Sequence, residues 1–124
     1  MSQLSTVALT KLATVSSVNM NLGTAQTLFV VPAGLSCVIS HVVVRNASIS
    51  LNTASYSFGF TGPAYNDVIT GATHTELTGP TLYTILTAKV GAKLGSASAV
   101  FSVIMNILQG APATTTMDVY GYLF

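Results

Sequence analysis

The sequence predicts an all-β protein, an antiparallel β-sandwich of jelly-roll-like type with about seven to eight strands. Glu and Lys, which favour long helices, are scarce, whereas Thr, Val and Ser dominate the chain. Apolar and polar residues alternate with period two over most segments. Gly, Pro and Asn interrupt these segments at fairly regular spacing, which is typical of a sandwich rather than of an open sheet.

The first strands lie on either side of a Pro-Gly turn. An extended segment over residues 5–20 precedes the strands expected over residues 26–31 and 35–46. Pro32 lacks a backbone donor and Gly34 tolerates a positive φ, so we expect the chain to turn between these two strands.

Alternation in the strand over residues 35–46 divides its side chains between two faces. Both faces carry apolar groups, which predicts a central position in the sheet. The only cysteine, Cys37, is expected to be a small buried hydrophobic residue, and it excludes an internal disulfide. One face holds Cys37, Ile39, His41, Val43 and Arg45, and the other holds Val38, Ser40, Val42 and Val44.

The second half of the chain contains further strands and one long irregular stretch over residues 62–80. In the strand over residues 54–61, Tyr56, Phe58 and Phe60 alternate with small residues and are expected to face the core. Phe101, Val103, Met105 and Ile107 share one side of their strand. The other expected strands cover residues 73–77, 81–88, 98–109 and 114–124.

The composition indicates a chain that is covered by other subunits. Charged residues make up only 6% of the chain, against about 25% in typical soluble domains. Its polarity comes instead from 13 Ser and 17 Thr. A free monomer usually carries more charge, so we expect a homo-oligomer. In this interpretation residues 1–22 form a partly extended, contact-making N-terminal arm, and residues 23–124 form a single β-sandwich domain.

Several partner classes are excluded by the same composition. Four basic residues are scattered along the chain rather than clustered, so we expect no nucleic-acid partner. No stretch approaches 18 uninterrupted apolar residues, so we expect no transmembrane segment and no membrane partner. The first residues lack a basic region followed by an apolar region, so we expect no signal peptide.

The candidates for a catalytic or metal site are few. Asp67 and Glu76 lie in the irregular stretch and suggest the carboxylate pair of a glycosidase, but loop carboxylates more often form turns. His74 and Glu76 share one face of an extended segment, and His41 adds a third metal-ligating side chain without forming a dense cluster. We therefore predict a protein that is not an enzyme, with no catalytic residues, no metal and no cofactor.

Two groups of residues are better candidates for contacts with a partner. The first is the tip formed by Tyr65, Asn66 and Asp67 in the irregular stretch, and the second is the face formed by Tyr120, Tyr122 and Phe124. Tyrosine is favoured at interfaces because it buries a large area and keeps a polar group. For the C-terminal aromatic residues, filling of the core is the alternative interpretation.

Three segments carry a resemblance to a known class of proteins. The strand and turn TLFVVPAG (residues 27–34), the strand VVVRN (42–46) and the ending MDVYGYLF (117–124) resemble segments of small β-sandwich proteins encoded among tailed-phage structural genes. Hairpins of this kind occur in head decoration proteins, head fibres and tail appendages. The resemblance therefore implies a virion structural protein, assembled in the host cytoplasm.

The resemblance and the charge-poor surface together give the expected function. We expect a capsid decoration (cement) protein that acts as a symmetric oligomer, a trimer, with itself and a major capsid protein as partners. A tail or head-fibre subunit is the alternative within the structural class. A carbohydrate-binding jelly-roll module is the alternative from another class, although the chain has no Trp to stack on sugars.

Overall fold

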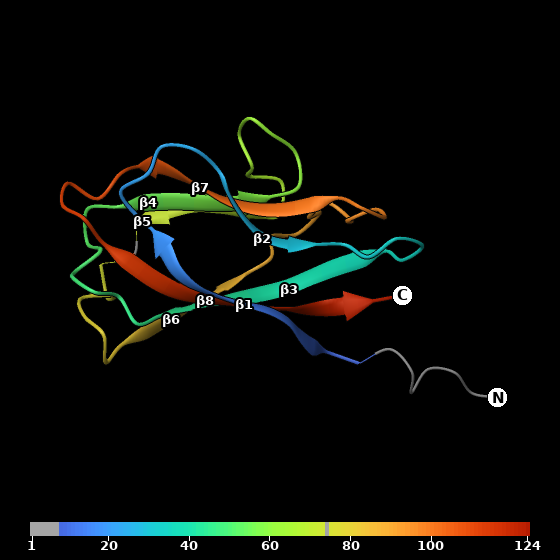
Figure 1. The fold of residues 1–124 in the computed structure, drawn as a ribbon, viewed down its shortest axis with the longest axis horizontal. Coiled ribbons are helices and arrows are strands. Elements are labelled where there is room, and N and C mark those ends of the chain that lie inside the picture. The colour runs from blue at the N-terminus through green and yellow to red at the C-terminus, as the bar shows by residue number, and fades with distance from the viewer. Residues whose placement is uncertain (1–7, 74) are drawn as a thin grey trace.

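The computed structural model describes residues 8–73 and 75–124, which form eight strands in two antiparallel sheets and contain no helix (Figure 1). The prediction of an all-β sandwich is therefore confirmed. No helix in this part of the chain is long and apolar enough to cross a membrane. One sheet has the strand order β1-β8-β3-β6 and the other has the order β2-β7-β4-β5. The strands are β1 (Thr10–Asn19), β2 (Gln26–Val30), β3 (Cys37–Arg45), β4 (Ser55–Gly59), β5 (Ile69–Thr73), β6 (Tyr83–Thr87), β7 (Val100–Ile107) and β8 (Thr114–Leu123).

The strands pair in a nested order along the chain. β1 pairs with β8, β2 with β7, β3 with β6, and β4 with β5, all antiparallel. The pairs β3–β8 and β4–β7 join these four pairs into the two sheets. Every connection except β4–β5 passes from one sheet to the other, so the first and last strands lie side by side.

The core lies between the two sheets and contains most of the apolar side chains that the alternation placed there. Tyr56, Phe58 and Phe101 are fully buried. The Phe101 ring lies 6.0 Å from that of Phe58 and 5.3 Å from that of Phe60, between centroids. Cys37 is also fully buried, as predicted. The first sheet contributes its buried residues Val42, Val44, Met117 and Val119.

β3 changes face within its length, so the alternation predicted for it is wrong beyond Ile39. Ile39 pairs with Gly121 of β8, but the next paired residue is His41, opposite Tyr120, so that Ser40 is an additional residue. One additional residue moves every later side chain to the opposite face. The core therefore receives Cys37, Ile39, Val42 and Val44, whereas His41, Val43 and Arg45 lie on the outer face and are half-buried.

Gly121 of β8 lies opposite this irregularity in β3. A Cβ atom at this position would lie closer than 3.0 Å to the carbonyl oxygen of Val38 and 3.2 Å from the Cα atom of Ile39. Both neighbours are backbone atoms of a central strand, so they have little freedom to move away. The close approach of β3 and β8 therefore requires glycine here.

Two further expectations differ from the structure. The strand within the irregular stretch is β5, at Ile69–Thr73 rather than at residues 73–77; His74 lies outside the described residues. Ile107 is 57% exposed and does not share the core face of Phe101. The pairing of β4 with β7 shifts between Ser55 and the next residue, which removes Ile107 from the buried row.

The N-terminal segment is partly built into the sandwich. Within the predicted arm, Thr10–Asn19 forms β1 and pairs with β8 at the margin of the first sheet. Residues 1–7 lie outside the described part of the chain. The contacts predicted for the arm stay a prediction.

Candidate functional site

In the first sheet, the outer face of strands β8, β3 and β6 carries exposed and half-exposed apolar and aromatic side chains. Tyr83 is 63% exposed and Ile85 is 52% exposed, and both belong to the marginal strand β6. The register places Ile85 beside Val43 of β3, and Tyr122 of β8 beside Val38. We call this surface the tyrosine face and define it by Val38, His41, Tyr83, Ile85, Tyr120 and Tyr122.

The C-terminal aromatic residues predicted as contacts lie outside the buried core. Tyr120 stacks on His41, with the ring centroids 4.7 Å apart and the planes 11° apart, and Nδ1 of His41 lies 3.1 Å from the Ser40 hydroxyl oxygen. Tyr122 is half-buried on the same face, and Phe124 is exposed beyond the end of β8. The structure therefore brings Tyr120 and Tyr122 together on the tyrosine face. Their role in binding stays a prediction.

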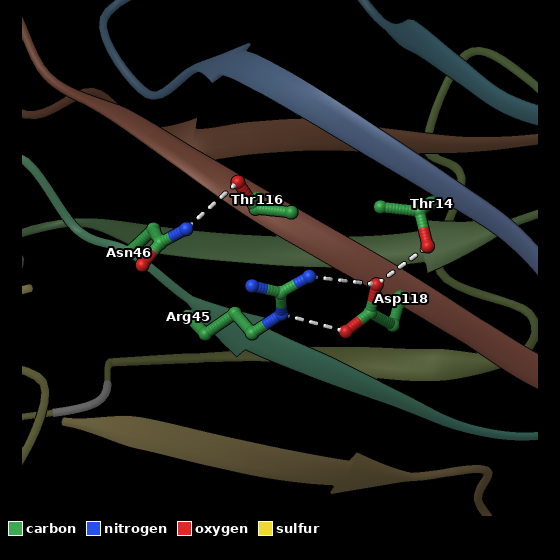
Figure 2. Close-up of polar contacts among 5 residues, drawn as sticks. All are labelled: Thr14, Arg45, Asn46, Thr116 and Asp118. Carbon is green, nitrogen blue, oxygen red and sulfur yellow. Dashed lines mark hydrogen bonds and ion pairs between the residues drawn. The ribbon is translucent and has the colours of Figure 1, made fainter. Parts of the chain in front are cut away.

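A buried carboxylate lies on the same side of this sheet and connects three strands. Asp118 of β8 is only 5% exposed. Its Oδ2 atom accepts a hydrogen bond from Arg45 Nε of β3 at 2.8 Å, and its Oδ1 atom accepts bonds from Arg45 Nη2 at 3.4 Å and from Thr14 Oγ1 of β1 at 2.8 Å (Figure 2). One side chain thereby ties β1 and β3 to the strand between them.

This network makes the carboxylate a stronger acid than a free one. The hydrogen bond from Arg45 lowers the pKa of Asp118, and the bond from Thr14 acts in the same direction, while burial opposes both. Nearer the start of β8, the Thr116 hydroxyl oxygen lies 3.5 Å from Nδ2 of Asn46, the residue that follows β3 (Figure 2). The Arg45–Asp118 pair was not predicted from the sequence. The only available signal was that both are isolated charges within apolar strands.

The predicted contact tip belongs to a loop that is held by its own polar groups. Asp67 Oδ1 accepts a hydrogen bond from the backbone N–H of Phe60 at 2.8 Å, and the N–H of Tyr65 bonds to the carbonyl of Thr61 at 3.0 Å. Tyr65 has a φ of 43° and is half-buried, and its ring lies over Gly62. Asn66 is exposed. Asp67 thus stabilises the loop, and the use of this tip in binding stays a prediction.

The same loop covers part of the outer face of the second sheet (Figure 1). The Ser57 hydroxyl of β4 bonds to the carbonyl of Ala64, and both Ser57 and Gly59 are buried under the loop. Lys89 Nζ donates to the carbonyl of Asn66 at 2.9 Å, which fixes the tip from the side of the β6–β7 connection. The two outer faces therefore differ in the described part of the chain: this loop shields part of the second sheet, whereas Tyr83 and Ile85 on the outer face of the first sheet are exposed.

Two of the residues considered for catalysis or metal binding, Asp67 and Glu76, form hydrogen bonds within the fold. Asp67 caps its loop as described, and Glu76 Oε2 accepts a hydrogen bond from the Thr84 hydroxyl at 2.8 Å. Within residues 8–73 and 75–124, no group of three or more His, Cys, Asp or Glu side chains lies close enough to hold a metal, and no pocket is found. His74 lies outside this range.

Comparison with known proteins gives likenesses in structure alone. No family model matches the sequence, and no curated protein matches it. A chain in the acid-stable capsid structure of Helicobacter pylori bacteriophage KHP30 superposes with a TM-score of 0.55 and 13% identity, over 94% of this chain and 92% of the other. A chain in the capsid asymmetric unit of cyanophage Pam1 gives a TM-score of 0.54 and 14% identity, over 94% and 84%. The protein has the fold of these phage capsid chains.

Proposed function

We propose that this chain is a structural protein of a phage virion, and within that class a capsid decoration protein that stabilises the shell as a symmetric oligomer, a trimer. The observation that carries the proposal is the likeness to chains of two phage capsids over nearly the whole domain. The nested strand pairing supports it, because the jelly roll, with eight strands in two Greek keys, recurs in viral capsid domains.

The surface of the molecule is suited to binding by burial of apolar area. Among the described residues, the charges beside the tyrosine face are the ion pair Arg45–Asp118 and the exposed Lys11, the cross-strand neighbour of Tyr120, so covering this face removes mainly uncharged surface from water. Burial stabilises a contact by roughly 25 cal/mol for each Å² of apolar surface removed from water. Many weak contacts of this kind become strong when they are repeated over the copies on one particle.

The N-terminal arm supplies a second contact in this proposal. Leu9 and Leu22, at either side of β1, are 48% and 39% exposed. We expect residues 1–22 to reach a neighbouring copy or the major capsid protein, with β1 anchored to β8. The tip at Tyr65, Asn66 and Asp67 and the C-terminal group at Tyr120, Tyr122 and Phe124 are the other proposed contacts. On this proposal the protein acts by binding and carries out no chemical step.

Reconstruction of the particle that carries this protein tests the proposal. Density for the sandwich on the head shell, with the chain in symmetric trimers, supports it. Density in a tail or head fibre assigns the protein to the alternative structural role. Absence of the protein from purified virions overturns the proposal. Native mass spectrometry of the free protein measures the stoichiometry independently.

A further inference from the structure

We propose that the free edge of β6 pairs antiparallel with β6 of a second copy, so that two β8–β3–β6 sheets become one continuous sheet across a two-fold axis. The inference deepens the proposed function, because it names the surface through which copies meet. A two-fold contact differs from the three-fold contacts of a trimer, so it links neighbouring trimers across a shell.

β6 is the regular edge among the four marginal strands of the described sheets. Proteins usually protect such edges with bulges, charges or proline, because an open edge recruits other strands. The pairing of β1 with β8 has two register shifts, and the pairings of β2 and β5 have one each. The pairing of β6 with β3 runs from His41–Thr87 to Arg45–Tyr83 without a shift. β6 itself, with the sequence YTILT, contains neither charge nor proline.

The direction of the backbone groups shows which residues are offered to a partner. The N–H of Ala88 donates to the carbonyl of Ser40 at 2.9 Å, just beyond the end of β6. Because successive residues of an antiparallel strand point to opposite sides, the N–H groups of Tyr83, Ile85 and Thr87 point away from β3. The next residue in this series, Lys89, indeed donates away from β3, to the carbonyl of Val68 at 2.9 Å.

The sequence of β6 is compatible with its own antiparallel copy. With the two-fold axis at Ile85, this residue faces Ile85 of the second copy and Tyr83 faces Thr87. This register forms about six backbone hydrogen bonds between the copies. Lys89 lies beyond this pairing, because its N–H on the same side already bonds to the carbonyl of Val68 in its own chain, and the two copies of Lys89 are at opposite ends of the contact, so no like charges meet.

A second copy of this chain is the occupant that these features favour. Two-fold symmetric pairs are the commonest form of self-association. The pairing also places Ile85 of one copy against Ile85 of the other and Tyr83 against Thr87, and Tyr83 and Ile85 are among the most exposed large apolar side chains of the protein. A five-residue pairing is a small contact, so we expect dimers to form in a concentration-dependent manner in solution and to gain strength on an assembled particle.

Cysteine cross-linking tests the register directly. In Ile85→Cys the two sulfurs belong to a directly opposed pair, whose Cα atoms lie about 5.5 Å apart, within the range of a disulfide. In the control Thr87→Cys the corresponding Cα atoms lie about 14 Å apart. We expect mild oxidation to give a covalent dimer of the first variant and little of the second. Equal dimer yields, or none from Ile85→Cys, overturn the proposal.

Sedimentation of two further variants tests the backbone contact. Ile85→Pro removes an N–H that points away from β3, so the sandwich is retained while the dimer loses hydrogen bonds. We expect its dissociation constant to rise by more than about tenfold, with an unchanged circular dichroism spectrum. Ile107→Lys is the matched control, because Ile107 is 57% exposed but lies on the central strand β7. An unchanged dissociation constant for Ile85→Pro, or an equal rise for Ile107→Lys, contradicts the proposal.

The outcome is separable from that of the proposed function. If Ile85→Pro still enters virions but its solution dimer is as stable as that of the wild type, the β6 contact is wrong and the virion role stands. If the wild-type protein dimerises through Ile85 but is absent from virions, the virion role is wrong and the β6 contact stands.

Discussion

Replacing Gly121 by alanine is expected to destabilise the protein by about 2–3 kcal/mol. The added Cβ would lie closer than 3.0 Å to the Val38 carbonyl oxygen, so β3 and β8 must separate by up to about 1 Å. Overpacking of this kind typically costs about 1–3 kcal/mol, and more when backbone rather than a side chain must yield. The loss of glycine's freedom in the unfolded chain returns only about 0.4–1 kcal/mol.

Thermal unfolding at one protein concentration measures this effect. An unfolding entropy of about 2.1 cal/mol/K per residue gives about 0.26 kcal/mol/K for this chain, so the melting temperature should fall by about 8–12 °C. Gly23→Ala is the matched control, because a Cβ at Gly23 meets no atom within 4 Å. It should change stability by less than about 0.5 kcal/mol. Equal melting temperatures for Gly121→Ala and the wild type would refute the close approach of β3 and β8.

Three further predictions concern charge and reactivity. Asp118→Asn should lower the free energy of unfolding at pH 7, and its difference from the wild type should shrink below about pH 4. The reason is that a lowered carboxylate pKa stabilises the fold above the unfolded pKa, and this contribution is lost as pH falls. Denaturant titrations at pH 7 and pH 3 measure this difference, and a difference that stays constant contradicts the prediction. Burial raises the pKa of Cys37 to about 11, so thiol reagents at pH 8 should modify it only after unfolding, and rapid labelling of the native protein would disagree. Assembly should weaken little between 0.05 and about 0.5 M salt, because few charges contribute to it; a steep loss of oligomer in sedimentation experiments argues against apolar contacts.

The accuracy of the sequence analysis differed between strands for a physical reason. In β4 the alternation of Tyr56 and Phe58 with small residues was sufficient, because both aromatic side chains face one apolar core. In β3 the same reasoning placed Val42 and Val44 on the face opposite to Cys37 and Ile39, whereas all four side chains are buried in the core. The additional residue at Ser40 is stabilised by pairing with β8 near Gly121, and a strand's own sequence does not contain its register against a distant partner.

Prediction of the candidate site from the sequence was limited because the same long-range information was missing. The sequence alone does not pair Asp118 with Arg45, because their contact depends on the alignment of β3 with β8. Tyr120 and Tyr122 were chosen as contact candidates because Tyr is favoured at interfaces, and the sequence left filling of the core open as the alternative; the structure places both on the outer face, half-buried. Recognising β6 as an open edge required the strand order, because the sequence YTILT could belong to a central strand or to a marginal one.

The side-by-side position of β1 and β8 has a mechanical consequence. Thr10, at the start of β1, lies opposite Gly121, and Asn19, at its end, lies opposite Thr114. A pull on the chain before Thr10, directed along the strand, acts on this ladder in shear, so its hydrogen bonds and the Thr14–Asp118 contact share the force instead of opening one after another. An anchor attached at the N-terminus would therefore transmit tension into the middle of the sheet without first peeling off its margin.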